Sequence, residues 1–145
     1  MNLPAPKPGL VIRYAYLWES EAREGRDEGT KDRPCAIVLV VLREGDHPIV
    51  RVLLVSHTPP NHAADALEIP AVTKQRLGLD SDRSWIVLNE ANDFIWPGPD
   101  LRPVPGRDPS TVAYGFLPPG YMRVLRERLE RRWRERNASA VSRTQ

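Results

Sequence analysis

The sequence contains a single cysteine, Cys35, which excludes an internal disulfide framework. Cys35 begins an apolar run, so we expect a buried structural thiol rather than a nucleophile. Long hydrophobic runs are also lacking, and the longest, Ala36 to Leu42, is far shorter than the ~20 residues of a membrane-spanning helix. Residues 1–8 carry no apolar stretch of the kind found in signal peptides. These absences predict a cytoplasmic protein that does not associate with membranes.

Proline is abundant, with 15 prolines among 145 residues. This number argues against long helices and for short strands with irregular connections. Charged residues make up 28% of the chain and hydrophobic residues 41%, which is the balance of an ordinary globular protein. We expect one domain over residues 1–136, with residues 1–8 as an extended lead and residues 137–145 as a disordered tail.

The net charge is only +2, but it is unevenly distributed. Residues 1–120 contain 13 lysines and arginines against 16 acidic residues, whereas residues 121–136 contain seven arginines against three glutamates. A basic segment of this kind can face phosphate groups or an acidic partner. The alternative is that its arginines only keep one face of a helix in solvent.

The apolar pattern predicts short strands followed by one helix. The expected strands are Leu10–Trp18, Cys35–Leu42, Ile49–Ser56, Leu67–Ile69 and Ser84–Asn89, with a single helical turn at Thr73–Leu77. Residues 20–32 and 96–110 are expected to be loops, the second because of its prolines. From Gly120 to about Arg136, apolar residues recur at helical spacing at Met122, Leu125, Leu129 and Trp133. The pattern predicts a small, curled antiparallel sheet with a closing helix.

Four segments between residues 8 and 95 resemble, in the same order, the MazF/PemK/Kid toxins of toxin-antitoxin systems. They are Pro8-Gly9-Leu10-Val11, then Glu28 to Arg33-Pro34 with the aliphatic residues that follow, then Leu54-Val55-Ser56-His57, and finally Leu77 to Asp80 with Ser84 to Glu90. Arg33-Pro34 matches the Arg-Pro of the family, and Ser56-His57 takes the place of its Thr-Ser pair. Two departures stand out: Lys31 replaces a family glycine, and Val87 and Asn89 occupy the positions where one branch carries a catalytic Arg and Asp.

The resemblance implies an SH3-like small antiparallel β-barrel with a C-terminal helix, usually in a homodimer. It also implies an endoribonuclease that cleaves single-stranded RNA without metal or cofactor, and an antitoxin-like protein that neutralises it. The departures at Val87 and Asn89 leave open an alternative, a catalytically degenerate barrel that acts as a protein-binding module for an antitoxin-like partner. A gyrase-directed poison with the same fold is a third possibility, because one fold carries several functions.

Metal-free RNA cleavage needs a base for the 2′-OH proton, a cation for the charged phosphorane and an acid for the departing 5′-oxygen. Arg33 is the expected cation, since its planar fork suits two phosphate oxygens; the alternative is an ion pair with Asp27, Glu28 or Asp32. Ser56 is expected to position the phosphate. His57, because an imidazole can both accept and donate a proton, or else Glu28, is expected to move the proton.

Several other residues are expected to contact RNA. Trp96, beside the proline-rich loop, is the aromatic residue we expect to be exposed, and an exposed ring can stack on an unpaired base. Thr58, Asn89 and Glu90 are further predicted contacts. The three histidines, with the nearby carboxylates Asp46 and Asp65, follow no familiar zinc spacing, so we expect no metal site.

Overall fold

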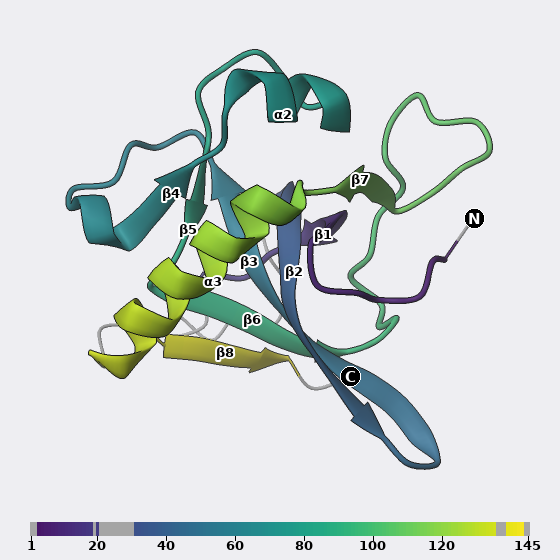
Figure 1. Ribbon diagram of the computed structural model, residues 1–145. Coiled ribbons are helices and arrows are strands. Elements are labelled where there is room, and N and C mark those ends of the chain that lie inside the picture. The colour runs from purple at the N-terminus through teal and green to yellow at the C-terminus, as the bar shows by residue number, and fades with distance from the viewer. Residues whose placement is uncertain (1–2, 19, 21–30, 136–138, 144–145) are drawn as a thin grey trace.

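The computed structural model describes residues 3–18, 20, 31–135 and 139–143 (Figure 1). Its strands are β1 (Leu10–Ala15), β2 (Asp32–Arg43), β3 (Asp46–Ser56), β4 (Ala66–Glu68), β5 (Trp85–Val87), β6 (Glu90–Ile95), β7 (Ala113–Phe116) and β8 (Ser139–Arg143). Its helices are a 3-10 turn, η1 (Ala63–Asp65), and the α-helices α2 (Ala71–Leu77) and α3 (Pro119–Arg134). The β2–β3 hairpin extends beyond the rest of the molecule (Figure 1).

The sheet is built around the β2–β3 hairpin, in which Ala36 pairs with Leu53 and Val40 with Val50. The two strands turn at Gly45, whose φ of 69° lies in the left-handed region that glycine adopts without strain. The main strand order is β4-β5-β3-β2-β1-β7. The first half of β3 pairs with β6 and its end pairs with β5, so one long strand connects two parts of the sheet. β8 joins β6 in parallel, and the other pairs are antiparallel.

The strand path has two ends, β4 and β7, which do not pair with each other in the described residues. The sheet is therefore not closed into a barrel, and the SH3-like barrel is not confirmed. The coarser prediction is confirmed: the fold is mainly β, with an antiparallel sheet and a helix near the C-terminus.

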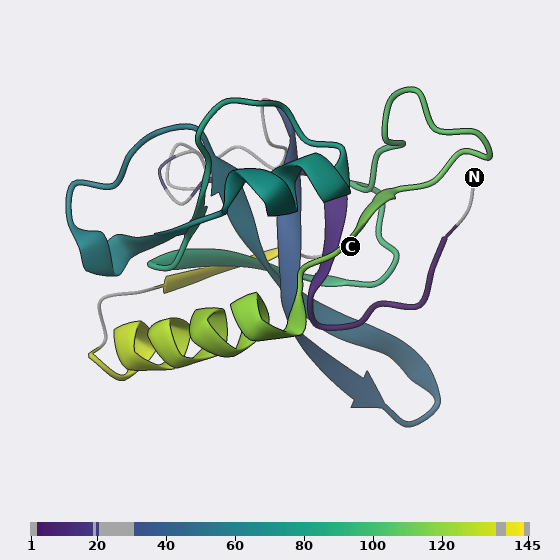
Figure 2. The same cartoon turned by 45° about the horizontal axis from the view of Figure 1, so that its top comes forward.

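Each face of the sheet carries a hydrophobic core because its strands alternate apolar residues between the two faces. One core includes Tyr14, Cys35, Ile37, Val52 and Phe94. The other core includes Val11, Ala36, Leu53, Ile86 and Leu88. α3 covers this second face (Figure 2). The predicted helical stripe makes the contact, with Met122 and Leu125 buried and Leu129 and Trp133 partly buried.

Two sequence expectations have clear outcomes in these cores. Cys35 is fully buried, as predicted, and burial raises the pKa of its thiol. The segment expected to be a disordered tail differs, because Ser139–Arg143 forms β8 along β6. Its anchor is Arg143, buried against Asp100, and a hydrophobic pattern cannot signal such a polar contact.

The sequence predicts that the protein does not associate with membranes. Among the described residues, no helix combines the length and the apolar composition that a membrane span needs.

Candidate functional site

Arg33 and Ser56 lie just beyond the paired part of the β2–β3 hairpin. The last pair of that register is Cys35 with Leu54, and Arg33 and Ser56 each lie two residues past it. Arg33 pairs instead with Tyr14 of β1, and Ser56 with Trp85 of β5. Both side chains share the face of Cys35 and Leu54, because every second residue of a strand points to the same side. The structure thus brings two of the predicted site residues to the same edge and the same face.

Arg33 is half-buried, and its guanidinium carbon lies 5.8 Å from the centroid of the Trp18 ring. The alternative partner Asp32 instead faces Arg13 at 3.9 Å and Arg102 at 3.6 Å. Within the described part of the chain, no carboxylate lies within 4.0 Å of the Arg33 guanidinium. Asp27 and Glu28, the other alternative partners, lie outside the described residues. Among the neighbours that are described, the charge of Arg33 is therefore not neutralised.

Ser56 is 5% exposed, and its Oγ accepts a hydrogen bond from the backbone N–H of Thr58 at 3.1 Å. The hydroxyl therefore shapes the turn that follows β3, and its own hydrogen donates to no acceptor within the described part of the chain. Thr58 itself is exposed in this turn.

His57 follows Ser56 directly but faces the other side of the sheet. It lines a small pocket of about 60 Å³ with Pro34 and Val55, and Val55 belongs to the core under α3. Arg33 and His57 thus lie on opposite faces, and the structure does not bring these two predicted catalytic residues together in one groove. Pro34 is nevertheless a wall of the His57 pocket and the chain neighbour of Arg33, so the two faces meet at this end of the sheet.

The imidazole of His57 is held by Asp80, whose Oδ2 lies 2.8 Å from Nε2. The side chains are 58% and 51% exposed, so the pair is open to solvent. When Nε2–H donates to the carboxylate, Nδ1 is left as the proton acceptor. The arrangement is that of a histidine base oriented by a carboxylate.

Asp80 is held in turn by a buried lysine from α2. Lys74 is 3% exposed, and its ammonium donates to Asp80 Oδ1 at 2.6 Å, to Ser84 Oγ at 2.7 Å and to the backbone carbonyl of Asp82. Helix α2 ends at Leu77 and is capped by Gly78, whose φ of 71° lies in the left-handed region. This turn reverses the chain, so that Asp80 faces Lys74. Partial burial raises the pKa of Asp80, but the hydrogen bond and charge of Lys74, with those of His57, hold it below its usual value.

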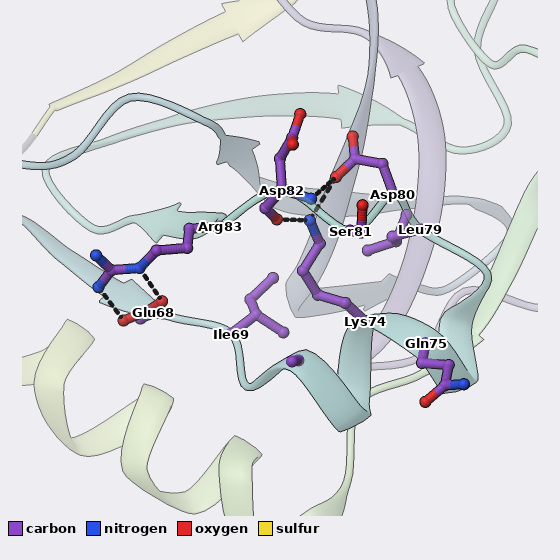
Figure 3. Close-up of a pocket in the computed structure, with 10 residues that line it drawn as sticks. Glu68, Ile69, Lys74, Gln75, Leu79, Asp80, Ser81, Asp82 and Arg83 are labelled. Carbon is purple, nitrogen blue, oxygen red and sulfur yellow. Dashed lines mark hydrogen bonds and ion pairs between the residues drawn. The ribbon is translucent and has the colours of Figure 1, made fainter.

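A cavity of about 350 Å³ opens beside this cluster, between α2 and the segment leading into β5 (Figure 3). Lys74, Asp80 and Asp82 line it on one side. Arg83 and Glu68 line another side and form a two-pronged ion pair, with both nitrogen–oxygen distances at 2.8 Å. Apolar side chains complete the wall at Ile69, Ala71 and Leu79. The cavity shares Lys74, Leu79 and Asp80 with the pocket of His57.

His57, Asp80 and Asp82 also offer three metal-ligating atoms within 4.8 Å of one another. The Lys74 ammonium already occupies one oxygen of Asp80, and His57 hydrogen-bonds directly to the other. This chemistry is that of an ion-pair network, in which the lysine supplies the positive charge. Of the residues weighed for a metal in the sequence, only His57 belongs to this group.

The remaining predicted residues lie away from this cluster. Trp96 is 6% exposed and packs in the core 6.1 Å from the Phe94 ring, so the expectation of an exposed ring is wrong. Asn89 and Glu90 are half-buried beside β8: the Asn89 carbonyl accepts from Ser139 N at 3.0 Å, and Glu90 accepts from the Tyr16 hydroxyl at 3.1 Å.

Sequence reasoning did not find Lys74, Asp80 or Asp82 as site residues. In the sequence, Asp80 stands out only as part of a segment that resembles the toxins. A lysine in a short helix gives no sequence signal of burial, because its partners come from the following loop. The visible signal was the density of polar residues between Leu79 and Ser84.

Comparison with known proteins adds no relative: no protein-family model, no curated protein and no solved structure matches the chain. The resemblance to the MazF/PemK toxins therefore stays a prediction.

Proposed function

We propose that the protein is a toxin-like endoribonuclease that cleaves single-stranded RNA without a metal. The observation that carries the proposal is that Arg33 and Ser56 lie on the same face of the sheet, each two residues past the last β2–β3 pair, Cys35 with Leu54. A guanidinium with no carboxylate neighbour in the described chain is suited to bind a phosphodiester, and a serine hydroxyl can donate to the same group.

The reaction is an attack of the ribose 2′-oxygen on the adjacent phosphorus. A 2′-O–P bond forms and the P–O5′ bond breaks, leaving a 2′,3′-cyclic phosphate and a 5′-hydroxyl. The 2′-OH proton passes to a base, and the departing 5′-oxygen takes up a proton. Arg33 stabilises the charge on the phosphorane. The need for a 2′-OH restricts the reaction to RNA.

His57 is the proposed base, because Asp80 orients its ring and leaves one nitrogen free to accept a proton. His57 is one residue beyond Ser56, and consecutive Cα atoms lie about 3.8 Å apart. Because the 2′-OH and the phosphorus belong to one linkage, the proposal requires that linkage to lie at the very end of the sheet, where Arg33 reaches it from one face and His57 from the other. Glu28, which lies outside the described residues, is the alternative proton carrier.

The same proposal includes three further properties that the resemblance to the toxins implies. They are an SH3-like barrel, assembly into a homodimer, and an antitoxin-like protein that blocks the site. The mainly antiparallel sheet and α3 support this reading of the architecture.

The test is a cleavage assay on single-stranded RNA with mass analysis of the product ends. We expect 2′,3′-cyclic phosphate ends, and a loss of at least about 100-fold in rate for Arg33→Ala, because removing one transition-state donor typically costs that much. Lys7→Ala removes a charge from an exposed site outside the sheet and is the matched control. Full activity of Arg33→Ala, at unchanged circular dichroism, would refute the role of Arg33.

A second candidate function is protein binding by a catalytically inactive chain. The observation that favours it is the exposed apolar surface of β2, where Leu39, Val41 and Leu42 are 46%, 44% and 82% exposed. Purified protein that leaves single-stranded RNA intact from pH 5 to 9, yet binds an antitoxin-like protein encoded next to it, would support this function over cleavage.

A further inference from the structure

The cavity beside α2 has the size of a site for one small ligand. Its volume of about 350 Å³ lies at the lower end of the range of roughly 300–1,000 Å³ typical of ligand pockets. Ile69, Ala71 and Leu79 give it an apolar wall, while charged groups stand at its rim (Figure 3). An apolar wall with a few oriented polar groups is the usual construction of a ligand site.

Arg83 supplies a flat, fixed surface on this rim. Its Nε and one terminal nitrogen each donate to Glu68 at 2.8 Å, which fixes the plane of the guanidinium. The indole of Trp85 lies 5.0 Å from the guanidinium carbon. Trp85 does not line the cavity, whereas Arg83 and Glu68 do. A guanidinium plane held in this way is a surface on which an unpaired base stacks.

Asp82 supplies a free acceptor on the side of the rim nearest His57, and its carboxylate points away from Arg83 (Figure 3). Its backbone is fixed, because its N–H donates to Asp80 Oδ1 at 3.2 Å and its carbonyl accepts from Lys74. Its exposed carboxylate makes no hydrogen bond or ion pair with any other part of the chain that the structure describes. The other two carboxylates of the rim are engaged, Asp80 by Lys74 and His57, and Glu68 by Arg83.

A free carboxylate discriminates among the four bases. It only accepts hydrogen bonds, through two oxygens. Guanine presents two adjacent donors, N1–H and the N2 amino group, which match the two oxygens. Adenine and cytosine place a single amino donor beside an acceptor nitrogen, and uracil places its donor between two carbonyls. These acceptors would face the carboxylate and be repelled.

We propose that the rim of this cavity binds a guanine base of the RNA substrate, with Asp82 reading the Watson–Crick edge and Arg83 offering a stacking surface to a neighbouring base. The inference rests on the proposed ribonuclease function and names its specificity. The cavity adjoins the proposed base, since a carboxylate oxygen of Asp82 lies within 4.8 Å of a ring nitrogen of His57. A guanine held there therefore places its own nucleotide next to the residue that moves the proton.

The test measures binding without cleavage. Fluorescein-labelled pentanucleotides with 2′-O-methyl groups at every position cannot undergo 2′-OH attack, and their Kd values follow from fluorescence anisotropy. We expect UUGUU to bind about tenfold more tightly than UUAUU, within the range that a two-pronged base contact provides. The same strand with inosine, which lacks the N2 amino group, is expected to fall between the two.

Asp82→Asn is expected to bring the Kd values for guanine and adenine to within about twofold, because the amide has only one acceptor oxygen. Glu44→Gln removes the same charge at the exposed hairpin turn and is the matched control, in which the tenfold ratio persists. We expect Asp82→Asn to fold like the wild type, because the exposed carboxylate makes no hydrogen bond or ion pair within the described residues. The inosine comparison tests the same base contact with the wild-type protein alone. Equal binding of guanine and adenine by the wild type, or a guanine preference that survives Asp82→Asn, would overturn the inference.

The two proposals fail separately. RNA cleavage without guanine preference would remove the cavity assignment and leave the ribonuclease standing. Guanine-selective binding by a protein that cuts no RNA would remove the ribonuclease and leave the cavity as a base-binding site.

Discussion

The ammonium of Lys74 lies 2.6 Å from Asp80 Oδ1, and the lysine side chain is 4% exposed while the aspartate side chain is 51% exposed. The buried charge is thus neutralised by a partner that also faces solvent and the imidazole of His57. A lysine is almost never buried unless it is paired. This ion pair therefore connects the stability of the α2 region with the orientation of the proposed catalytic histidine.

Lys74→Met is expected to lower the free energy of unfolding. The substitution leaves Asp80, the Asp82 carbonyl and Ser84 Oγ without their shared donor. We expect a loss of roughly 2–3 kcal/mol, less than for a fully buried pair because Asp80 keeps contact with water. Urea denaturation measures the change. Gln75→Met, at the exposed neighbouring position, is the control and should stay within about 0.5 kcal/mol of wild type. Equal stability of both variants would contradict a structural role for the ammonium.

The lowered pKa of Asp80 makes the free energy of unfolding depend on pH. This pKa is lower in the folded chain than in the unfolded one, because Lys74 and His57 together outweigh the opposing effect of burial. The unfolded state therefore binds a proton more readily. The stabilisation is complete above the unfolded pKa of about 4 and is lost as the pH falls through the folded pKa. Thermal unfolding of wild type and Asp80→Asn should differ at pH 6 and converge below about pH 3. Two parallel curves over this range would contradict the shift.

The central strands of the sheet could be predicted from the sequence, whereas strand β6 could not. β2 and β3 were expected because they are rich in β-branched and aliphatic residues, and the structure has them as its central hairpin. β6 is not expected from the sequence, since three of its six residues, Glu90, Asn92 and Asp93, are polar or charged. Its Asn92 is fully buried because the side-chain amide bonds the backbone N–H and carbonyl of Leu17 at 2.8 and 2.7 Å. A partner 75 positions away in the sequence leaves no local pattern to detect.

The candidate site also has a part that the sequence predicts and a part that it does not. Arg33 and Ser56 share a face of the sheet, two residues past the pair of Cys35 with Leu54, and this relationship follows from two strands that the sequence predicts. The alternation of side chains then separates Arg33 from His57, which the linear order of the motifs does not reveal. Lys74 joins the cluster only because the loop after α2 returns to it, and that return depends on the left-handed conformation of Gly78.

The ion pair of Arg143 with Asp100 connects strand β8 with the loop before β7, so we expect the stabilities of these two segments to be coupled. The Arg143 guanidinium donates to Asp100 Oδ2 at 2.9 Å, and the two side chains are 5% and 8% exposed. We expect Arg143→Met to lower the free energy of unfolding by roughly 3–5 kcal/mol, because it leaves a buried carboxylate without its partner. Adding Asp100→Asn should restore part of the loss, with a coupling of roughly 1–3 kcal/mol in a double-mutant cycle measured by urea denaturation. Strictly additive single effects would show that the two charges do not stabilise each other.

The arginines of α3 divide into two groups with different expected roles. Arg128 donates to the Ala63 carbonyl and Arg132 to Asp65, so both hold the helix to η1. Four others are exposed and make no side-chain hydrogen bond or ion pair to other described residues: Arg123, Arg126, Arg131 and Arg134. Exposed arginines along one helix are suited to contact RNA phosphates.

If these four arginines bind phosphate, the affinity for single-stranded RNA should fall steeply with salt. Replacing all four with glutamine should reduce the slope of log K against log salt by about 3, because each phosphate contact on a single strand contributes about 0.7. Anisotropy titrations of a 2′-O-methyl oligonucleotide between 50 and 300 mM salt measure the slope. The control is a Lys7→Gln, Arg43→Gln variant, which alters charges away from α3 and should leave the slope near the wild-type value. A slope unchanged by the four substitutions would assign these arginines to solvent, and the phosphate contacts would then have to come from the sheet edge around Arg33.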